Sequence, residues 1–248
     1  WTDSPYERGP AWRRRLTAAM ERRVVEAATR LVFVNQQTAD RVMSKYPEAW
    51  RARARVVPQG FQAPTSGLPP LAPGGPLRIV YTGRFYDGIR GPGAVLQALD
   101  RLNRREPLAG RVVVDFIGQD MARHAATATS LGLDGVVSFT GRVPPPAAQE
   151  AAAAAHVLLV IDAPSDGPGL FLPSKLIDYL PLHRPVLGVT PVDGPSADLL
   201  RRLGYRTAAP GDVDGIADAI AALVVAHAAG ALGASSHHAE VAAAYDIR

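Results

Sequence analysis

One stretch of the sequence carries the main argument about the fold: LPSKLIDYL at residues 172–180, which RPVL follows at residues 184–187. It predicts a loop broken by proline, then a short helix, then a buried strand. Lys175 and Asp178 stand three residues apart, so their side chains share one face of that helix. In an open α/β sheet, ligands bind just beyond the carboxyl ends of strands. A cation and a carboxylate there suit a ligand with a phosphate and a sugar diol, such as a nucleotide-sugar.

The stretch belongs to a regular alternation of apolar strands and helices that begins at residue 77. Strict alternation with nearly continuous apolar strands is typical of a parallel sheet covered by helices on both faces. We therefore predict an α/β fold with a Rossmann-like parallel sheet. Strands are predicted at 77–81, 112–117, 136–139, 157–161, 186–189 and, weakly, 205–208. Helices are predicted at 93–105, 120–131, 147–154, 174–180, 197–203 and 213–226.

The residues before this alternation predict only part of a second Rossmann-like domain. Asn35 is a candidate N-cap for the second of two helices. Two short strands cannot form an independent core. We expect either that an earlier part of this domain is missing or that the segment docks onto the domain that follows. The predicted elements are helices at 11–29 and 36–45 and strands at 31–34 and 55–58.

Composition excludes several classes of protein. The 248 residues, 47% of them hydrophobic, suit one large globular domain or two small ones. The absence of cysteine excludes disulfides and thiolate metal sites. No apolar run is long enough for a membrane span, and no secretory leader opens the sequence. We expect a cytoplasmic protein.

The net charge of +4 is carried almost entirely by arginine, since Lys45 and Lys175 are the only lysines. Together with the abundance of Ala, Gly, Pro and Val, this bias indicates a GC-rich bacterial genome. Basic clusters at 13–15 and 22–23 could contact anionic lipid or nucleic acid. No aromatic residues interleave with them as a base-stacking surface requires. We expect no nucleic acid partner and at most peripheral contact with the inner face of the membrane.

Glycine and arginine mark the end of the first strand of the alternation. Gly83 and Arg84 close it, and Arg90 follows six residues later. A glycine lets a ligand approach the backbone, and two arginines can bind a diphosphate through paired hydrogen bonds. The G-x-G-x-x-G dinucleotide motif is absent. For this loop alone, two solvated arginines on the surface are the more common arrangement.

The next two strands also end in glycine, at Gly118 and at Gly141, and Arg142 and Val143 follow the latter. Consecutive glycine endings give a rim of exposed backbone N–H and C=O groups, which could bind a nucleobase and ribose. Taken singly, each glycine is ordinary for a turn.

The fourth strand leads into a loop that contains Asp162 and Asp166. Either carboxylate could be a general base, although turn formation is the more common role of Asp in such a loop. Farther on, the backbone amides near Ser174 and Lys175 would face phosphates at the positive end of a helix. Asp178 could accept hydrogen bonds from a ribose diol, or it could be a solvated helix residue.

Together these residues resemble the donor-binding domain of the GT-B glycosyltransferases of family 4. The resemblance runs from about residue 77 to 223 and rests on the glycine–arginine strand ends, PSKLIDYL and the RPV that follows. VPQGF at residues 57–61 is similar to the turn that ends the acceptor domain in these enzymes.

The resemblance implies a retaining transfer of a sugar from a nucleotide-sugar, in bacterial polysaccharide or glycoconjugate synthesis, with no cofactor and no metal. By position, Arg84 and Arg90 match the catalytic pair that binds the donor diphosphate and stabilises the leaving group. Asp178 matches the second acid of the E-x7-E motif of the family. The donor-binding residues expected on these grounds are Gly83, Gly118, Arg142, Val143, Ser174, Lys175 and Asp178.

The resemblance also implies four segments: the end of an acceptor-side domain (1–62), a linker rich in Pro and Gly (63–76), the donor-binding domain (77–229) and an Ala-rich tail or partial helix (230–248). Most of the acceptor domain is not in this sequence. We therefore expect the chain to bind nucleotide but to transfer little sugar alone. The partners expected are a UDP- or GDP-sugar, a glycan or lipid-linked acceptor, and a missing N-terminal domain or partner chain.

Two residues depart from the family pattern. Position 178 has Asp in place of Glu, and the first acid of the motif falls on Leu170, with Asp166 as a substitute nearby. Two alternatives stay open. The first is another GT-B enzyme, such as a UDP-sugar 2-epimerase, which would need a histidine near the nucleotide. The second is a non-catalytic nucleotide-sugar-binding subunit that another chain completes. The histidines considered for the first alternative are His124, His156 and His183.

Overall fold

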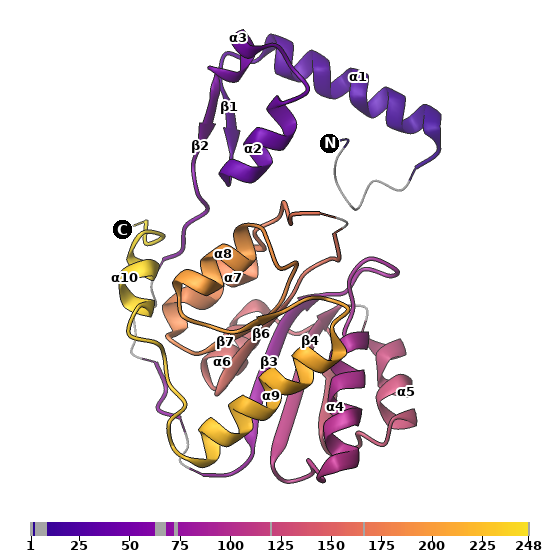
Figure 1. The fold of residues 1–248 in the computed structure, drawn as a ribbon, viewed down its shortest axis with the longest axis vertical. Helices are drawn as coiled ribbons and strands as arrows, with labels where there is room; N and C mark the ends of the chain where they lie inside the picture. The colour runs from indigo at the N-terminus through magenta and orange to yellow at the C-terminus, as the bar shows by residue number, and fades with distance from the viewer. Residues whose placement is uncertain are drawn as a thin grey trace. The chain divides into compact units, whose positions relative to one another are not determined.

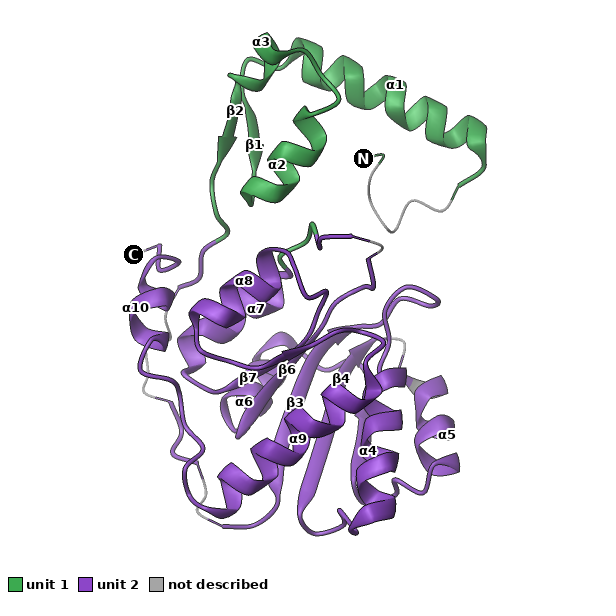
Figure 2. Ribbon diagram, in the orientation of Figure 1, with its two compact units in different colours: residues 1–59, 170–172 green, residues 60–169, 173–248 purple. Residues whose placement is uncertain are grey.

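The computed structural model describes residue 2 and residues 9–62, 68–71, 74–119, 121–165 and 167–247. The chain divides into two compact units, shown in separate colours in Figure 2. The smaller unit comprises residues 1–59 and 170–172, and the larger comprises residues 60–169 and 173–248. Each unit is described separately below.

The larger unit is built on a six-stranded sheet in which every neighbouring pair of strands is parallel (Figure 1). The strand order is β5-β4-β3-β6-β7-β8. This architecture confirms the prediction of a Rossmann-like α/β fold. The strands are β3 (Leu77–Arg84), β4 (Val112–Gln119), β5 (Val137–Thr140), β6 (Val157–Ile161), β7 (Val186–Val189) and β8 (Thr207–Ala208).

Helices cover both faces of this sheet, as right-handed crossovers between parallel strands require. Helices α4, α5 and α9 lie on one face, where α4 packs along α9 (Figure 1). Helices α6, α7 and α8 cover the other face and contact β3, β6 and β7. Their bounds are α4 Gly93–Arg105, α5 Ala122–Ser130, α6 Pro145–Ala153, α7 Ser174–Tyr179, α8 Pro195–Arg202 and α9 Val213–Ala228. A 3-10 turn, η1 (Leu180–Leu182), follows α7.

The main hydrophobic core lies between the sheet and the layer of α4, α5 and α9. Leu77, Ile79 and Tyr81 of β3 point into it, as the period of two along a strand dictates. Val95 and Leu99, four residues apart on α4, meet them from the helix side. This burial fixes which face of β3 is covered, and therefore which way the residues at its carboxyl end project.

β3 and β4 extend beyond the predicted strand ends. Their ladder continues through Gly83, paired with Gly118, to Arg84, paired with Gln119. By contrast, β3 pairs with β6 only at Ile79 and Val80. The two strands are unpaired beyond those residues, at the position where the order of the sheet reverses. Such a topological switch point is where open α/β sheets form ligand crevices.

The last described residues form a helix, α10 (His238–Ala243), and then return to the start of the unit. Phe61 donates its N–H to the carbonyl of Tyr245 at 2.9 Å, and Ile247 donates to the carbonyl of Phe61 at 3.2 Å. The segment predicted as a tail or partial helix is therefore packed and hydrogen-bonded. No helix among the described residues is both long enough and apolar enough to cross a bilayer.

The smaller unit contains a separate sheet of two parallel strands. Its core is small, with Val25, Val42 and Met43 at the centre. Asn35 caps α2 as predicted, since its side chain accepts a hydrogen bond from the N–H of Thr38 at 2.7 Å. The elements are α1 (Ala11–Ala27), β1 (Leu31–Phe33), α2 (Gln36–Met43), α3 (Glu48–Arg51) and β2 (Ala54–Val56).

Candidate donor-binding site

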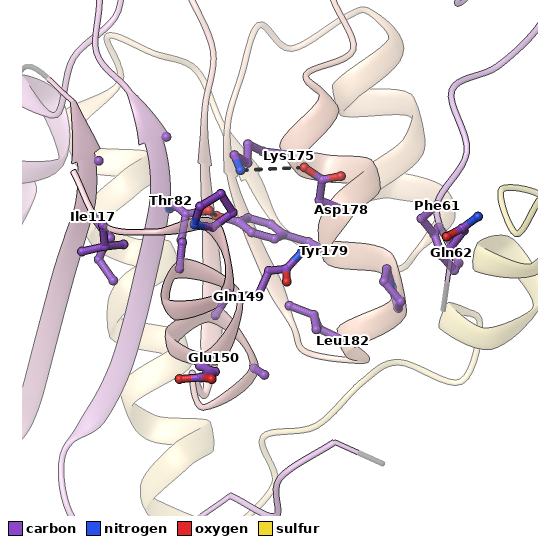
Figure 3. A pocket seen from close by; sticks show the side chains of 18 of the residues that line it. Phe61, Gln62, Thr82, Ile117, Gln149, Glu150, Lys175, Asp178, Tyr179 and Leu182 are labelled. Atoms are coloured by element: carbon purple, nitrogen blue, oxygen red, sulfur yellow. Dashed lines mark hydrogen bonds and ion pairs between the residues drawn. The ribbon is translucent and has the colours of Figure 1, made fainter. Parts of the chain in front are cut away.

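A cavity of about 1140 Å³ lies in the larger unit at the switch point, between the sheet edge and helices α6 and α7 (Figure 3). The carboxyl ends of β3 and β4 form one wall, and Lys175, Asp178 and Tyr179 of α7 form another. The cavity brings together seven of the residues predicted for the site. They are Gly83, Arg84, Gly118, Arg142, Val143, Lys175 and Asp178.

Two predicted residues are not among those that line the cavity. Ser174 is the exposed first residue of α7. Arg90 lies in the loop after β3, where its Nη2 donates a hydrogen bond to the carbonyl oxygen of Arg84 at 3.0 Å. Asp166, the predicted substitute for the missing acid, falls outside the described residues. Arg90 is thus one contact removed from the cavity wall.

Tyr179 satisfies the backbone N–H of Thr82, which has no partner on β6 because β3 and β6 are unpaired at this position. The N–H of Thr82 donates to the hydroxyl oxygen of Tyr179 at 2.9 Å, and the two hydroxyl groups lie 3.0 Å apart. In Figure 3 the ring of Tyr179 points from α7 toward Thr82. Burial raises the pKa of Tyr179 to about 12, so the hydroxyl stays protonated. A side chain replaces the strand that would otherwise bond Thr82.

Gly118 has a structural reason of its own for being glycine. Its φ of +143° lies outside the range that other residues favour. A Cβ atom at this position would overlap the carbonyl oxygen of Gly83 on the neighbouring strand. Gly83 and Gly118 both line the cavity and carry no side chain, so a ligand can approach their backbone.

Lys175 and Asp178 lie as their spacing predicts, on one face of α7. Nζ of Lys175 and Oδ2 of Asp178 are 3.8 Å apart, and their side chains are 44% and 51% exposed (Figure 3). Partial burial raises the pKa of Asp178, while the charge and hydrogen bond of Lys175 lower it. Such a loose, half-exposed pair contributes little to stability and can exchange its contact for a ligand.

The electrostatics of the cavity favour an anion. Three cationic residues line it, Arg84, Arg142 and Lys175. Asp178 lies beside Lys175, and Glu150 projects from α6. Guanidinium groups bind phosphate oxygens with paired, charge-assisted hydrogen bonds. The arrangement can therefore bind a phosphorylated ligand and offer one carboxylate to its hydroxyl groups.

Asp162 does not have the geometry of a general base for this cavity. It directly follows β6, is only 6% exposed, and is not among the residues that line the cavity. Burial raises its pKa from 3.8 to about 6, although a hydrogen bond from Ser196 and the charge of Arg90 lower it. We assign it to the protein interior beside Arg90.

The histidines considered for an epimerase have structural contacts elsewhere. The ring of His124 packs edge-on against Phe85, with centroids 5.2 Å apart. His156 accepts a hydrogen bond from the N–H of Arg78 at 3.0 Å. His183 ends η1 with a left-handed backbone, at φ 46°. None of them is among the lining residues, and the described part of the chain holds no cluster of three potential metal ligands.

Several residues of the cavity were not predicted. Gln149 projects from α6, and Phe61 lies at the far end of the cavity (Figure 3). Ile247, which also lines the cavity, donates its N–H to the carbonyl oxygen of Phe61. α6 consists almost wholly of Ala and Pro, so periodicity gives no sign of its inward face. Phe61 and Ile247 are far apart in the sequence, so no local pattern predicts that they are in contact.

The fold of the chain is similar to that of solved GT-B glycosyltransferases. The lipopolysaccharide outer core galactosyltransferase WaaB shares 17% identity at a TM-score of 0.63, over 88% of this chain and 57% of WaaB. WaaG, a glycosyltransferase of lipopolysaccharide biosynthesis, shares 18% identity at 0.67, over 98% of this chain and 66% of WaaG. A TarM mutant from S. aureus, solved in complex with UDP, shares 13% identity at a TM-score of 0.66. The match covers 90% of this chain and 42% of the TarM chain. The chain thus spans less than two thirds of each structure.

A search of curated proteins with the sequence gives no match. The family model described as glycosyl transferases group 1 matches residues 76–225, which is more than half of the chain. The matched residues contain the six-stranded sheet and most of the cavity. The chain therefore belongs to the group 1 glycosyltransferases.

Proposed function

We propose that the larger unit binds the nucleoside diphosphate of a UDP- or GDP-sugar. The chain would then be the donor side of an enzyme that transfers the sugar to a glycan, lipid or small-molecule acceptor. One observation carries the proposal: the cavity at the switch point places three cationic side chains beside a carboxylate. Family membership, and the UDP bound to the TarM mutant, support it.

Each part of the donor has a candidate partner. The backbone of Gly83 and Gly118, with Arg142 and Val143, would contact the base and ribose. Asp178 would accept hydrogen bonds from the ribose diol, and Lys175 would contact a phosphate. Arg84 and Arg90 would stabilise the charge on the departing nucleoside diphosphate.

Because two guanidinium groups can supply that charge stabilisation, we propose that the reaction needs no metal or other cofactor. Retention of the anomeric configuration is proposed from the family resemblance alone. Both points can be tested once a donor is known, by adding a chelator and by NMR of the product.

Titration calorimetry with UDP, GDP and ADP tests the binding proposal. We expect one nucleotide to bind the chain, and Arg84→Ala to weaken that binding by roughly tenfold to a hundredfold, since charge-assisted hydrogen bonds are lost. Arg105→Ala, on the exposed carboxyl end of α4, is the matched control and should bind as the wild type does. The proposal fails if none of the three nucleotides binds.

We further propose that residues 1–62 are the end of an acceptor-side domain, that 63–76 link it to the donor domain, and that other residues or a partner chain complete it. The two-stranded sheet has exposed apolar side chains, Val32 and Val56 among them. The chain also covers only 57% of WaaB. Little transfer activity is therefore expected from this polypeptide alone, and vigorous turnover without a partner would contradict the proposal.

A non-catalytic subunit is the second candidate function. Leu170, an apolar residue, stands where the family resemblance expects the first acid. Its carbonyl oxygen accepts hydrogen bonds from Thr38 Oγ1 at 2.7 Å and Asn35 Nδ2 at 3.2 Å. Nucleotide binding with no sugar transfer, even after the acceptor-side residues are supplied, would favour this candidate over the enzyme.

Peripheral contact with an anionic membrane is proposed for α1. Five arginines of this helix are exposed, and its acidic residues number only two. Basic side chains near a membrane surface are attracted by anionic lipid. Co-sedimentation with vesicles that contain phosphatidylglycerol should exceed that with phosphatidylcholine alone, and should fall with added salt.

A further inference from the structure

The loop that joins β3 to α4 is held by a backbone bridge within it and by an ion pair to α5. Tyr86 and Arg90 form an antiparallel bridge, with N–H to carbonyl distances of 2.9 Å and 2.8 Å. Asp87 forms an ion pair with Arg123 of α5 at 2.6 Å. Gly88, with φ of 61°, supplies the left-handed residue that so short a turn requires. The loop is thus a closed hairpin of five residues.

Phe85 anchors this hairpin in the core. Its side chain is 1% exposed and stacks on Tyr81 with ring centroids 4.8 Å apart. It also contacts Phe116, at 5.7 Å between centroids. Because Phe85 and Tyr86 are consecutive and the former is buried, the backbone of Tyr86 is held next to the core.

The ring of Tyr86 lies beneath both arginines predicted to bind the diphosphate. The guanidinium carbons of Arg84 and Arg90 are each 5.2 Å from its centroid. They are therefore at most twice that distance apart, although like charges repel. The electron-rich face of an aromatic ring attracts guanidinium groups and offsets part of that repulsion.

Arg90 is held by further contacts but keeps one donor available. Its Nη2 donates to the carbonyl oxygen of Arg84, and its charge faces the buried Asp162. Its Nε is buried and has no hydrogen-bond partner among the described residues. A buried donor of this kind is costly unless a ligand satisfies it.

We propose that Tyr86 is a positioning residue, which holds Arg84 and Arg90 at the spacing needed for the two phosphates of a nucleoside diphosphate. Tyr86 acts through the two arginines and makes no contact with the donor. The inference rests on the proposed function, because it takes the diphosphate as the ligand of these arginines.

Calorimetry with UDP, GDP, UMP and GMP tests this role. We expect Tyr86→Leu to weaken the binding of the preferred diphosphate about tenfold, from the loss of two cation–π contacts. Binding of the corresponding monophosphate should change much less. Tyr86→Phe keeps the ring and should restore the affinity. Asp87→Ala breaks the ion pair with Arg123 but leaves the ring, so it should weaken diphosphate binding less than Tyr86→Leu does.

Fluorinated phenylalanines at position 86 separate positioning from folding, because they keep the shape of the ring while weakening its negative face. Diphosphate affinity should fall with each added fluorine at unchanged melting temperature. Equal affinity across this series, in a chain that binds nucleotide, would overturn the role of Tyr86 and leave the proposed function standing. A wild-type chain that binds no nucleotide would overturn both.

Discussion

At the scale of single residues, the charges of the larger unit divide into two groups. Arg84, Lys175 and Asp178 line the cavity with partly or largely exposed side chains, where a ligand can reach them. Asp162 is buried, and its neighbours offset only part of the cost of its charge. Substitution of the buried carboxylate should therefore change mainly the stability of the fold, whereas substitution of the exposed groups should change mainly ligand binding.

Asp162→Asn should stabilise the chain above about pH 6. The folded state raises the pKa of Asp162 from 3.8 to about 6, so it binds the proton more tightly than the unfolded state does. The wild type consequently loses about 3 kcal/mol of stability as the pH rises through that window, and keeps the penalty above it.

Urea unfolding at several pH values checks this expectation. The gain from Asp162→Asn should be present near pH 8 and nearly absent at about pH 3, where both states are mostly protonated. Asp218→Asn, at an exposed position of α9, should have little effect at either pH. Equal effects of Asp162→Asn at both ends of the range would contradict the assignment.

At the scale of elements, the ends of the strands determine the shape of the site. β3 remains paired with β4 through Gly83 and Gly118, but its ladder with β6 is limited to Ile79 and Val80. Near its carboxyl end, β3 is thus hydrogen-bonded along the edge that faces β4 and unpaired along the edge that faces β6. Tyr179 supplies a hydrogen-bond acceptor at the open edge, so the crevice does not leave Thr82 unpaired.

Two glycines at these strand ends should respond differently to alanine. A Cβ at Gly118 would overlap the carbonyl oxygen of Gly83, whereas a Cβ at Gly141 would meet no atom within 4 Å. We expect Gly118→Ala to destabilise the chain by about 1–3 kcal/mol, as overpacking does. Gly141→Ala should be close to neutral. Thermal unfolding of both variants checks this, and similar melting temperatures would show that the strands can move apart.

Much of the fold could be predicted because its signals are local. The strands from 157 to 161 and from 186 to 189 have the predicted bounds, since an unbroken apolar run between turn residues defines each one. Strand ends were harder to predict. β3 runs to Arg84 because a neighbouring strand continues beside it, and that neighbour lies 35 positions away in register.

The candidate site was predictable where a motif carries it and not where distant residues complete it. Lys175 and Asp178 follow from their spacing on one helix. The hydrogen bond between Tyr179 and Thr82 joins residues 97 positions apart, and no local sequence pattern predicts it. Asp162 is hydrogen-bonded to Ser196 of α8, which follows it by more than 30 residues. The sequence around Asp162 therefore gives no sign that this carboxylate is buried.

At the scale of the whole molecule, the C-terminal segment is attached to the larger unit through a buried histidine. His238 is 1% exposed, and its Nε2 lies 2.8 Å from the carbonyl oxygen of Leu180. Its Nδ1 lies 2.5 Å from the hydroxyl of Tyr205. Burial lowers the pKa of His238, as does the charge of nearby His183, although the bond to Leu180 opposes the shift.

Acidification should loosen this segment. Below about pH 6.5 a detached His238 takes up a proton that the attached, neutral form does not bind, so the detached state gains stability. Hydrogen exchange of residues 231–247 should therefore lose protection between about pH 7.5 and 5.5, after correction for intrinsic rates. His237→Gln, on the exposed neighbour, should behave as the wild type does. A His238→Gln variant that loses protection to the same extent between these pH values would contradict this origin.

The pairing of Phe61 with Asp246 also has a consequence for engineering. Because Phe61 and Ile247, near the two ends of the larger unit, are hydrogen-bonded neighbours, these ends are adjacent, and units of this kind tolerate circular permutation. A short glycine bridge from residue 247 to residue 60, with new termini in the exposed turn at Gly110, would leave the order of strands in the sheet unchanged. The unit can thus be handled as a cassette, cut out at one point and spliced into a different host chain.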